Sequence, residues 1–317
     1  MTTSLVSATY SQAATANFQA WINEIYTALV TTCGLTQSAD TGQMAVPTTA
    51  TLPGAANTSA GFYMFQFNDT LQATAPVFIR LDFGTGTSVP APSILVQVGT
   101  GTNGAGTLTG RVTLQQQATS NSAIQNPGIT TYNSRYCYNA TQGFLGVVWK
   151  TGSTTSLGNI AMAGLYVFRS VGASGATTAD SIQVLVSSSG SSNGTTGNAG
   201  NMQVIDNNIP TVYSGGSNPL LSQTTWNAIS PFGNSASLVG TTGQVFPCWQ
   251  LANTLSQAAI GITNALAMAF ISEIPIGTTT NINILGSTTL TYMSAGQPFG
   301  SSVGLGGTTY TLMMIWQ

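Results

Sequence analysis

Charged side chains are nearly missing from this sequence, and histidine is missing altogether. Of 317 residues, 5 are Lys or Arg and 7 are Asp or Glu, which is 4% of the chain, compared with about 25% in an average soluble protein. Enzymes take most of their acids, bases and metal ligands from His, Asp, Glu, Lys and Cys. We therefore expect that the protein is not an enzyme and that it has no catalytic, metal-binding or cofactor-binding residues.

Two further absences concern partners. Nucleic-acid binding needs clustered basic residues, and the basic residues here are scattered, so we expect no nucleic-acid partner. No run of 18 consecutive apolar residues occurs, although 42% of the residues are hydrophobic, and we expect no membrane span. The N-terminus has no basic stretch followed by an apolar one, which argues against a signal peptide. The basic residues are Arg80, Arg111, Arg135, Lys150 and Arg169.

Three cysteines, Cys33, Cys137 and Cys248, are far apart and form no CxxC motif. This spacing excludes a zinc ribbon and a thioredoxin-type motif. The burial preference of cysteine favours three reduced, buried side chains. One disulfide, or a bridge between two molecules, is the alternative.

One segment has the 3.6-residue apolar period of an amphipathic helix. Alanines precede this stripe and Gly34 follows it, which predicts a helix at about residues 14–33. Two interpretations stay open: the stripe packs on the chain's own sheet, or it docks on a neighbouring subunit. On the second interpretation its first six members are candidate interface residues. The stripe consists of Phe18, Trp21, Ile22, Ile25, Tyr26, Leu29 and Val30.

Most of the remaining sequence alternates, or runs apolar over short stretches between turn residues, as β-strands do. Residues 35–60, rich in Thr, Ala, Pro and Gly, are expected to form a loop or extended arm, and residues 260–274 fit a strand or a helix. The pattern predicts a mainly β fold: an antiparallel β-sandwich or jelly-roll-like architecture with an N-terminal amphipathic helix. Strands are expected at residues 62–68, 77–83, 93–99, 109–116, 144–150, 159–170, 180–188, 281–285, 288–293 and 308–316.

These patterns divide the chain into three regions. Residues 1–60 form an N-terminal helix and extended arm, residues 61–190 a β-sandwich domain, and residues 201–317 a second β-rich region. The Gly/Ser/Asn-rich stretch from Ser187 to Gly200 separates the last two, as a linker or as a hairpin tip within one domain. The apolar C-terminal end is expected to complete a sheet or to enter an interface. Its candidate interface residues are Met313, Met314, Ile315 and Trp316.

Few residues suggest chemistry. Arg80 and Asp82 share one face of a predicted strand, where they form either a surface pair or an ion pair between subunits. The cluster Arg135-Tyr136-Cys137-Tyr138 combines a cation with rings that suit a sugar or a partner loop, or else it is a loop packed on the rim. Asp40 and Asp69 lie in turn-like contexts, where carboxylates often bond to the backbone.

The segment from Ala39 to Gly110 contains several short motifs. They include Asp40-Thr41-Gly42-Gln43, Phe67-Asn68-Asp69-Thr70-Leu71-Gln72 and the glycine-rich Gly99-Thr100-Gly101-Thr102-Asn103-Gly104. In these motifs the chain resembles a group of tailed-bacteriophage virion proteins, mostly structural or tail-associated, over about a quarter of its length. The resemblance implies a particle component, and it carries over no catalytic or binding residue.

Together with the scarcity of charge, the resemblance implies a structural component of a bacteriophage virion, in the tail, baseplate or fibre apparatus. The expected partners are copies of the chain itself, as a trimer or hexamer, and other virion proteins. The expected location is the virion, assembled in the cytoplasm of a host bacterium. A capsid decoration protein or head fibre is a second interpretation. A third is an adhesin that binds host surface glycans through exposed rings such as Trp226 or Tyr213.

Overall fold

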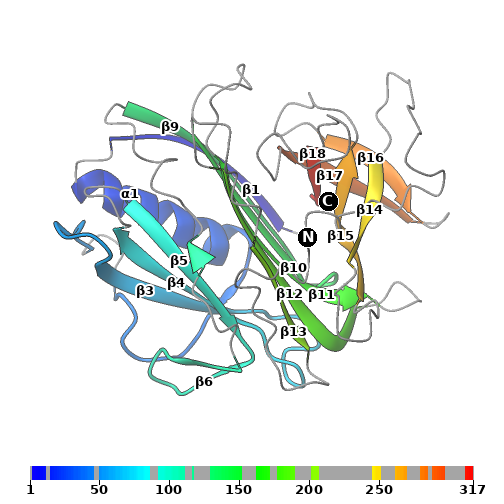
Figure 1. The fold of residues 1–317 in the computed structure, drawn as a ribbon, viewed down its shortest axis with the longest axis horizontal. Helices are drawn as coiled ribbons and strands as arrows, with labels where there is room; N and C mark the ends of the chain where they lie inside the picture. Colours follow the sequence, from blue (N-terminus) through cyan, green and yellow to red (C-terminus); the bar gives the residue numbers. More distant parts are fainter. Residues whose placement is uncertain are drawn as a thin grey trace.

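The fold is built from antiparallel β-sheets and one N-terminal helix (Figure 1). The computed structural model describes residues 2–11, 15–45, 50–85, 92–110, 116–117, 129–151, 162–171, 177–189, 201–206, 245–250, 261–269, 279–284, 288–296 and 311–316. Every strand pairing in these residues is antiparallel. The mainly β, antiparallel fold with an N-terminal helix is thus confirmed.

A small sheet of five strands forms one layer. Its strands follow the order of the sequence, so it is a meander. On the central strand pair, Tyr63 lies opposite Leu81 and Phe65 opposite Ile79, all four buried. Tyr63 and Phe65, two residues apart on the strand, therefore help to build one apolar face. The sheet contains β2 (Thr36–Gln37), β3 (Ser59–Gln66), β4 (Phe78–Thr85), β5 (Pro92–Gly99) and β8 (Gln116–Gln117), and a separate hairpin joins β6 (Gly101–Thr102) and β7 (Leu108–Thr109).

The large sheet has 11 strands in the order β1-β9-β10-β11-β15-β18-β17-β16, with β12, β13 and β14 paired off this path. The run from β9 to β13 is again a meander, and β1 joins it from the start of the chain. The strands are β1 (Thr2–Ser11), β9 (Ile129–Asn139), β10 (Phe144–Thr151), β11 (Met162–Val171), β12 (Thr177–Ser189), β13 (Asn201–Asp206), β14 (Val245–Gln250), β15 (Gly261–Ala269), β16 (Thr279–Ile284), β17 (Thr288–Gly296) and β18 (Thr311–Ile315).

The predicted helix is present as α1 (Thr15–Tyr26), which continues as a π-helical turn, η1 (Thr27–Thr32). The wider turn is closed by a hydrogen bond from the Cys33 N–H to the Ala28 carbonyl at 2.8 Å. Gly34 has a φ of +81°, a conformation that glycine adopts without strain, and the next N–H, of Leu35, donates to the Leu29 carbonyl. Gly34 therefore ends the helix where the sequence predicts.

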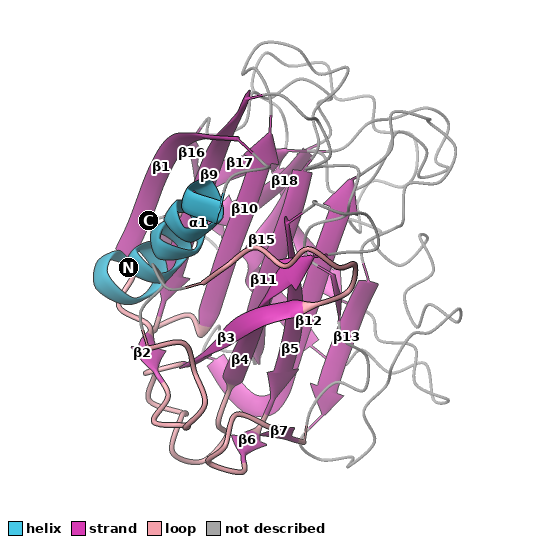
Figure 2. Cartoon of the chain, turned by 90° about the vertical axis from the view of Figure 1, so that its left-hand side faces the viewer, coloured by secondary structure: helices cyan, strands magenta, loops and turns pink. Residues whose placement is uncertain are grey.

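The two sheets pack face to face, and α1 contributes to the same core. In Figure 2 the small sheet and α1 lie in front of the large sheet. Burying a side chain of the size of Leu, Ile or Phe contributes about 1.5–3 kcal/mol each, so this cluster is the main stabilising feature. The large sheet contributes Tyr136, Tyr138, Leu145, Val147, Leu165, Val167, Ile182 and Val184, and the small sheet contributes Tyr63, Phe65, Phe67, Val77, Ile79, Leu81, Phe83, Ile94, Val96 and Val98.

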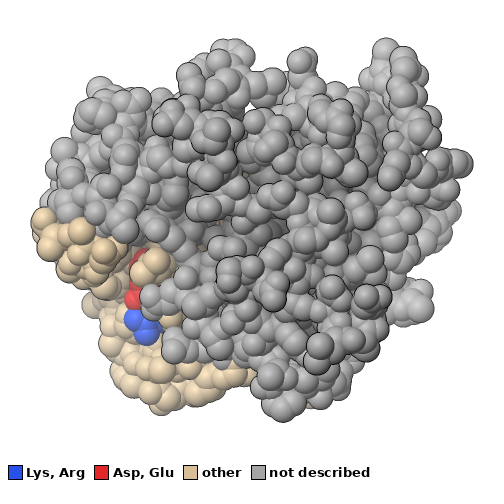
Figure 3. All heavy atoms as spheres, viewed as in Figure 1, with Lys and Arg blue, Asp and Glu red and all other residues tan. Residues whose placement is uncertain are grey.

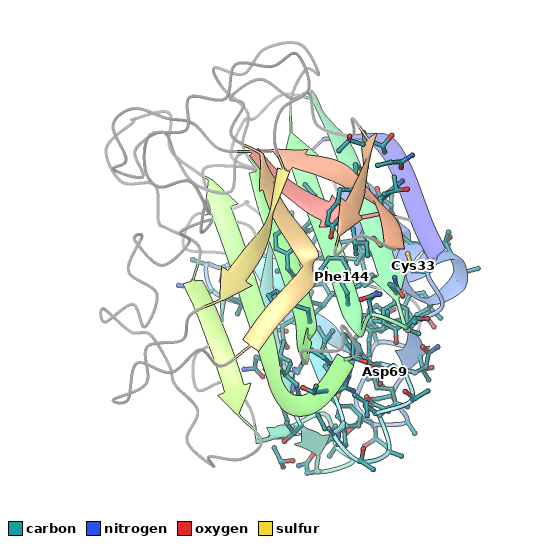
Figure 4. The ribbon with its side chains drawn as sticks, turned by 90° about the vertical axis from the view of Figure 1, so that its right-hand side faces the viewer. Cys33, Asp69 and Phe144 are labelled. Carbon is teal, nitrogen blue, oxygen red and sulfur yellow. The ribbon has the colours of Figure 1, made fainter. Side chains whose placement is uncertain are left out.

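The opposite face of the large sheet is covered by the C-terminal strands. Figure 4 shows β14 to β18 in front of this face. The thiol of Cys137 on β9 donates to the Ile315 carbonyl on β18, with 3.2 Å between sulfur and oxygen. Gly146 on β10 lies against the sulfur of Met314. The large sheet is consequently buried on both faces near its centre.

Two observations bear on the organisation expected from the sequence. β1 was not expected, yet it pairs with β9 from Thr2↔Tyr138 to Ser11↔Ile129, so the first strand of the chain belongs to the same sheet as the middle of the chain. The stretch at residues 187–200 falls between β12 and β13, which are paired neighbours, and this fits its interpretation as a hairpin tip. Of the strand expected at residues 109–116, the described parts are the ends of β7 and β8, and residues 260–274 contain the strand β15.

Candidate functional site

The apolar stripe of α1 faces the inside of the protein. Phe18, Trp21, Ile22, Ile25 and Leu29 are at most 3% exposed and belong to the core between the sheets. The ring of Trp21 meets Phe83 of β4 edge to face, with 6.4 Å between ring centres. Of the two interpretations of the stripe, these contacts fit packing on the chain's own sheets, which cover it.

Tyr26, the remaining candidate interface residue of the helix, is half-buried at the margin of this core. Its ring centre lies 4.8 Å from that of Tyr63, and its hydroxyl donates to Gln37 Oε1 at 2.7 Å. Burial and the nearby Tyr26 raise the pKa of Tyr63 to about 12. The Tyr26 side chain thus joins the helix to the small sheet.

The C-terminal candidates also lie within the fold. Met314 and Ile315, on β18, are buried. The N–H of Trp316 donates to the Thr291 carbonyl at 2.8 Å, and the Trp316 side chain is partly exposed. Met313 is paired opposite Ala267, and its side chain lies outside what the structure describes. The apolar terminus therefore completes a sheet, which is one of the two outcomes expected for it.

Arg80 and Asp82 form a two-bond ion pair on the outer face of β4. The Arg80 Nε and Nη2 donate to the Asp82 carboxylate at 2.9 and 2.6 Å. The third guanidinium nitrogen donates to the Gly106 carbonyl, and the guanidinium carbon lies 3.9 Å from the Phe62 ring centre. In Figure 3, acidic and basic atoms lie side by side at one place in the described part of this face. The pair lies within one subunit, as a partly exposed pair.

Asp40 fastens the loop after β2 onto the hairpin of β6 and β7. Its carboxylate accepts hydrogen bonds from the Ser38 hydroxyl at 2.7 Å and from the Gly106 N–H at 3.1 Å. Partial burial acts to raise the pKa of Asp40, but these bonds, together with bonds from the Thr102 hydroxyl and its own amide, leave the pKa below its ordinary value. Asp40 is therefore held as a carboxylate that organises backbone.

A second ion pair, between Arg169 and Asp69, lies inside the sandwich. Arg169 on β11 donates through Nε and Nη2 to the Asp69 carboxylate at 2.6 and 3.0 Å, and through Nη1 to the Ala75 carbonyl at 2.7 Å. The two side chains are 0% and 3% exposed. Asp69 lies in the turn between β3 and β4, as predicted, and Figure 4 shows it near one end of the molecule, away from the C-terminal strands. This pair fastens the small sheet to the large one.

The cluster Arg135-Tyr136-Cys137-Tyr138 is not a rim loop, because it lies on β9 of the large sheet, a strand that is paired on both sides, with β1 and with β10. Alternate residues point to opposite faces of a strand, and the contacts follow this rule. The Tyr136 hydroxyl donates to Glu24 of α1 at 2.9 Å and the Tyr138 hydroxyl accepts from the Asn68 N–H at 2.9 Å, whereas Cys137 meets the C-terminal strand. The cluster joins three layers, and its tyrosines are engaged within the chain.

The described residues offer little to a reaction. No three His, Cys, Asp or Glu side chains among them come together as metal ligands would. Burial raises the pKa of the Cys33 thiol to about 12 and that of the Cys137 thiol further still, so both stay protonated near neutral pH and are poor nucleophiles. Both are free, buried thiols, as favoured from the sequence. Cys248 is in β14, and Trp226 and Tyr213 lie outside the described residues.

Each acidic side chain that the structure describes accepts a hydrogen bond from another part of the chain: Glu24 from Tyr136, Asp40 from Gly106, Asp69 from Arg169 and Asp82 from Arg80. None of the helices in the described part of the chain is long and apolar enough to cross a membrane. No protein-family model, no curated protein and no solved structure gave a significant match to this chain.

Proposed function

We propose that this protein is a structural component of a tailed-bacteriophage virion, located in the tail, baseplate or fibre apparatus and assembled as a symmetric oligomer. The observation that carries the proposal is the use of charge. The carboxylates of Glu24, Asp40 and Asp69 each fasten one element of the fold to another, and that of Asp82 pairs with Arg80 of its own strand. Their role is architectural, as is expected of a protein that holds a shape.

The composition supports the same function. With a net charge of −2 over 317 residues, the chain lacks the charge that normally keeps a free monomer from associating. A subunit whose surface is covered by neighbours in a particle has less need of that charge. The resemblance of residues 39–110 to tailed-bacteriophage virion proteins supports the same assignment. This segment includes the strands β3, β4 and β5 of the small sheet.

The test is the protein content of purified virus particles. Particles from the host that carries this gene are purified through a density gradient, and their proteins are identified and counted by mass spectrometry. We expect the chain to be present at a few to a few tens of copies for each particle. Its absence from particles that contain the known head and tail proteins would overturn the proposal.

The copy number of the protein and its location on the particle separate the alternative functions. Hundreds of copies, with antibody labelling on the head, would indicate a capsid decoration protein or head fibre in place of a tail part. Labelling at the tail tip, together with binding to host surface glycans on an array, would indicate an adhesin. The light-scattering mass of the purified protein would then separate the expected trimer from the expected hexamer.

A further inference from the structure

We infer that β1 is an interface strand, and that its open edge pairs antiparallel with β1 of a second copy of this chain across a twofold axis. The inference rests on the proposed function only in so far as a virion part assembles with copies of itself. The evidence is the contrast between β1 and the other strands that lie at sheet edges.

β1 is a long edge strand. It runs over 10 residues, and every one of them is paired with β9 on one side. On its other side the described part of the chain supplies no partner strand, and β1 lies at the margin of the ribbon in both Figure 2 and Figure 4. Since alternate residues of an edge strand direct their N–H and C=O groups away from the neighbouring strand, this edge offers a row of hydrogen-bonding groups.

The sequence of β1 carries none of the usual devices that prevent edge pairing. Natural proteins protect edges by shortness, charge, proline, a bulge or a covering helix or loop. TTSLVSATYS contains no charged residue and no proline, and its register with β9 is unbroken. The helix α1 and its continuation η1 contact β1, and their buried side chains belong to the core on the face of the sheet. The other strands of the large and small sheets that are paired on one side only differ. β2 and β8 have two residues each, β14 contains Pro247, and β13 ends on Asp206.

One other edge, β16, is also uncharged, but it is shorter, with six residues. Its sequence, TTNINI, includes Asn281, whose side chain is exposed and accepts a hydrogen bond from Thr291 of the neighbouring strand. β1 therefore offers the longest unprotected edge in the described part of the chain. β16 supplies a matched control, because it is an edge of the same sheet.

A second copy of β1 fits this edge best. An antiparallel edge is complementary to itself across a twofold axis, the commonest symmetry of homo-oligomers, and an uncharged strand places no like charges opposite each other. Only alternate residues of β1 direct their N–H and C=O groups to the open edge, so each residue pairs with a position an even number of residues away in the second copy. The twofold axis therefore passes beside a residue that lies opposite its own copy. Pairing over most of the strand puts this axis at Val6 or Ser7. Twofold axes occur in a hexamer with two stacked rings and not in a simple trimer, so the inference selects the hexamer.

The test introduces charge at the centre of the strand. With the axis at Val6 or at Ser7, the two copies of position 7 lie on one face within about 5–8 Å of each other. We expect light scattering to show an even number of subunits for the wild-type protein. Ser7→Lys and Ser7→Glu should each raise the protein concentration at which half of these contacts dissociate by about tenfold or more. An equimolar mixture of the two variants should restore the wild-type value, because Lys then faces Glu.

The control is Thr279→Lys, which adds the same charge at an exposed position of the β16 edge, and we expect it to leave the wild-type mass unchanged. Wild-type monomers or trimers at all concentrations, Ser7 variants that associate like the wild type, or a mixture that fails to recover would each overturn the inference.

A second measurement covers the case in which the Ser7 variants fail to fold. Hydrogen exchange of the wild-type protein, measured above and below its association concentration, should show slower exchange of residues 2–11 in the associated state only. Equal exchange in the two states would overturn the inference. Presence of the protein in virions is unaffected by either result, so the two proposals fail separately.

Discussion

Two arginine–carboxylate pairs differ in where they lie and agree in nearly everything else. In both, two guanidinium nitrogens bond one carboxylate, the third bonds a backbone carbonyl, and the guanidinium lies over a ring: Phe62 for Arg80 and Phe67 for Arg169. The Arg80 and Asp82 side chains are 22% and 8% exposed, whereas those of Arg169 and Asp69 are 0% and 3% exposed.

The separation along the chain differs as well. Asp82 is two residues from Arg80 on the same strand, and Asp69 is 100 residues from Arg169 and joins two sheets. In a partly exposed ion pair, the attraction between the two charges is offset by a comparable loss of hydration, so the pair contributes little to the free energy of unfolding. A buried pair is costly to create, but removing one partner leaves a charge without compensation in an apolar core. The same chemistry is therefore expected to have different consequences at the two places.

The largest effect is expected from Asp69→Asn. This change keeps the shape of the side chain but leaves the buried Arg169 cation without its counter-charge, which costs about 3–5 kcal/mol. Urea unfolding followed by tyrosine and tryptophan fluorescence measures the loss. The double variant Asp69→Leu with Arg169→Met, which removes both charges, should recover much of the lost stability. A single variant as stable as the wild type would show that the pair does not hold the sheets together.

Gly143→Ala perturbs the same pair from the backbone. Gly143 has a φ of +53°, and its carbonyl oxygen accepts a hydrogen bond from the Arg169 N–H at 3.0 Å. A methyl group there would lie 2.9 Å from both Cγ and Cδ of Arg169, and the guanidinium beyond them is fixed by three hydrogen bonds. We expect a loss of about 1–3 kcal/mol in the free energy of unfolding. Gly54→Ala, at an exposed position with no heavy atom within 4 Å of the new methyl, should change it by much less.

The contrast between the pairs also shows what the sequence can predict. Arg80 and Asp82 were placed on one face of one strand because a period of two needs only local spacing. The α1 stripe was predicted for the same reason. Asp69 was placed in a turn, but its partner was missed, because 100 residues separate the two. A single arginine in the otherwise apolar run of β11 was the available signal, since a buried cation requires a partner.

The strand β1 was missed for a related physical reason. Thr2–Ser11 contains three serines and three threonines, which give little apolar alternation, and its pairing depends on β9, more than 100 residues away. The two interpretations of the α1 stripe stayed open in the sequence because periodicity identifies an apolar stripe without identifying what covers it. Here the cover is the small sheet of the same chain.

A smaller effect is expected when the outer pair is broken. Asp82→Asn should lower the free energy of unfolding by about 1 kcal/mol or less, because Arg80 remains partly hydrated and keeps its contacts with Gly106 and Phe62. Raising the salt concentration should reduce the difference further, because the screening length falls to about 3 Å at 1 M. The measurement is urea unfolding at low and high salt beside Asp69→Asn. A loss as large as that of Asp69→Asn would mean that burial does not distinguish the pairs.

The smallest effect is expected at Asp40, on the same outer side of the small sheet as the exposed pair. Its pKa in the folded protein is below the ordinary value of 3.8, so ionised Asp40 contributes stability above that pH, and the contribution is lost as the pH falls through the folded pKa. Asp40→Asn should therefore be less stable than the wild type by under about 1 kcal/mol at pH 6, and the two stabilities should converge below pH 3.8. Thermal unfolding between pH 2.5 and 7 measures this difference. A gap that stays constant over this range would mean that ionisation of Asp40 does not contribute to stability, and that charge on this side of the sheet has no role beyond shape.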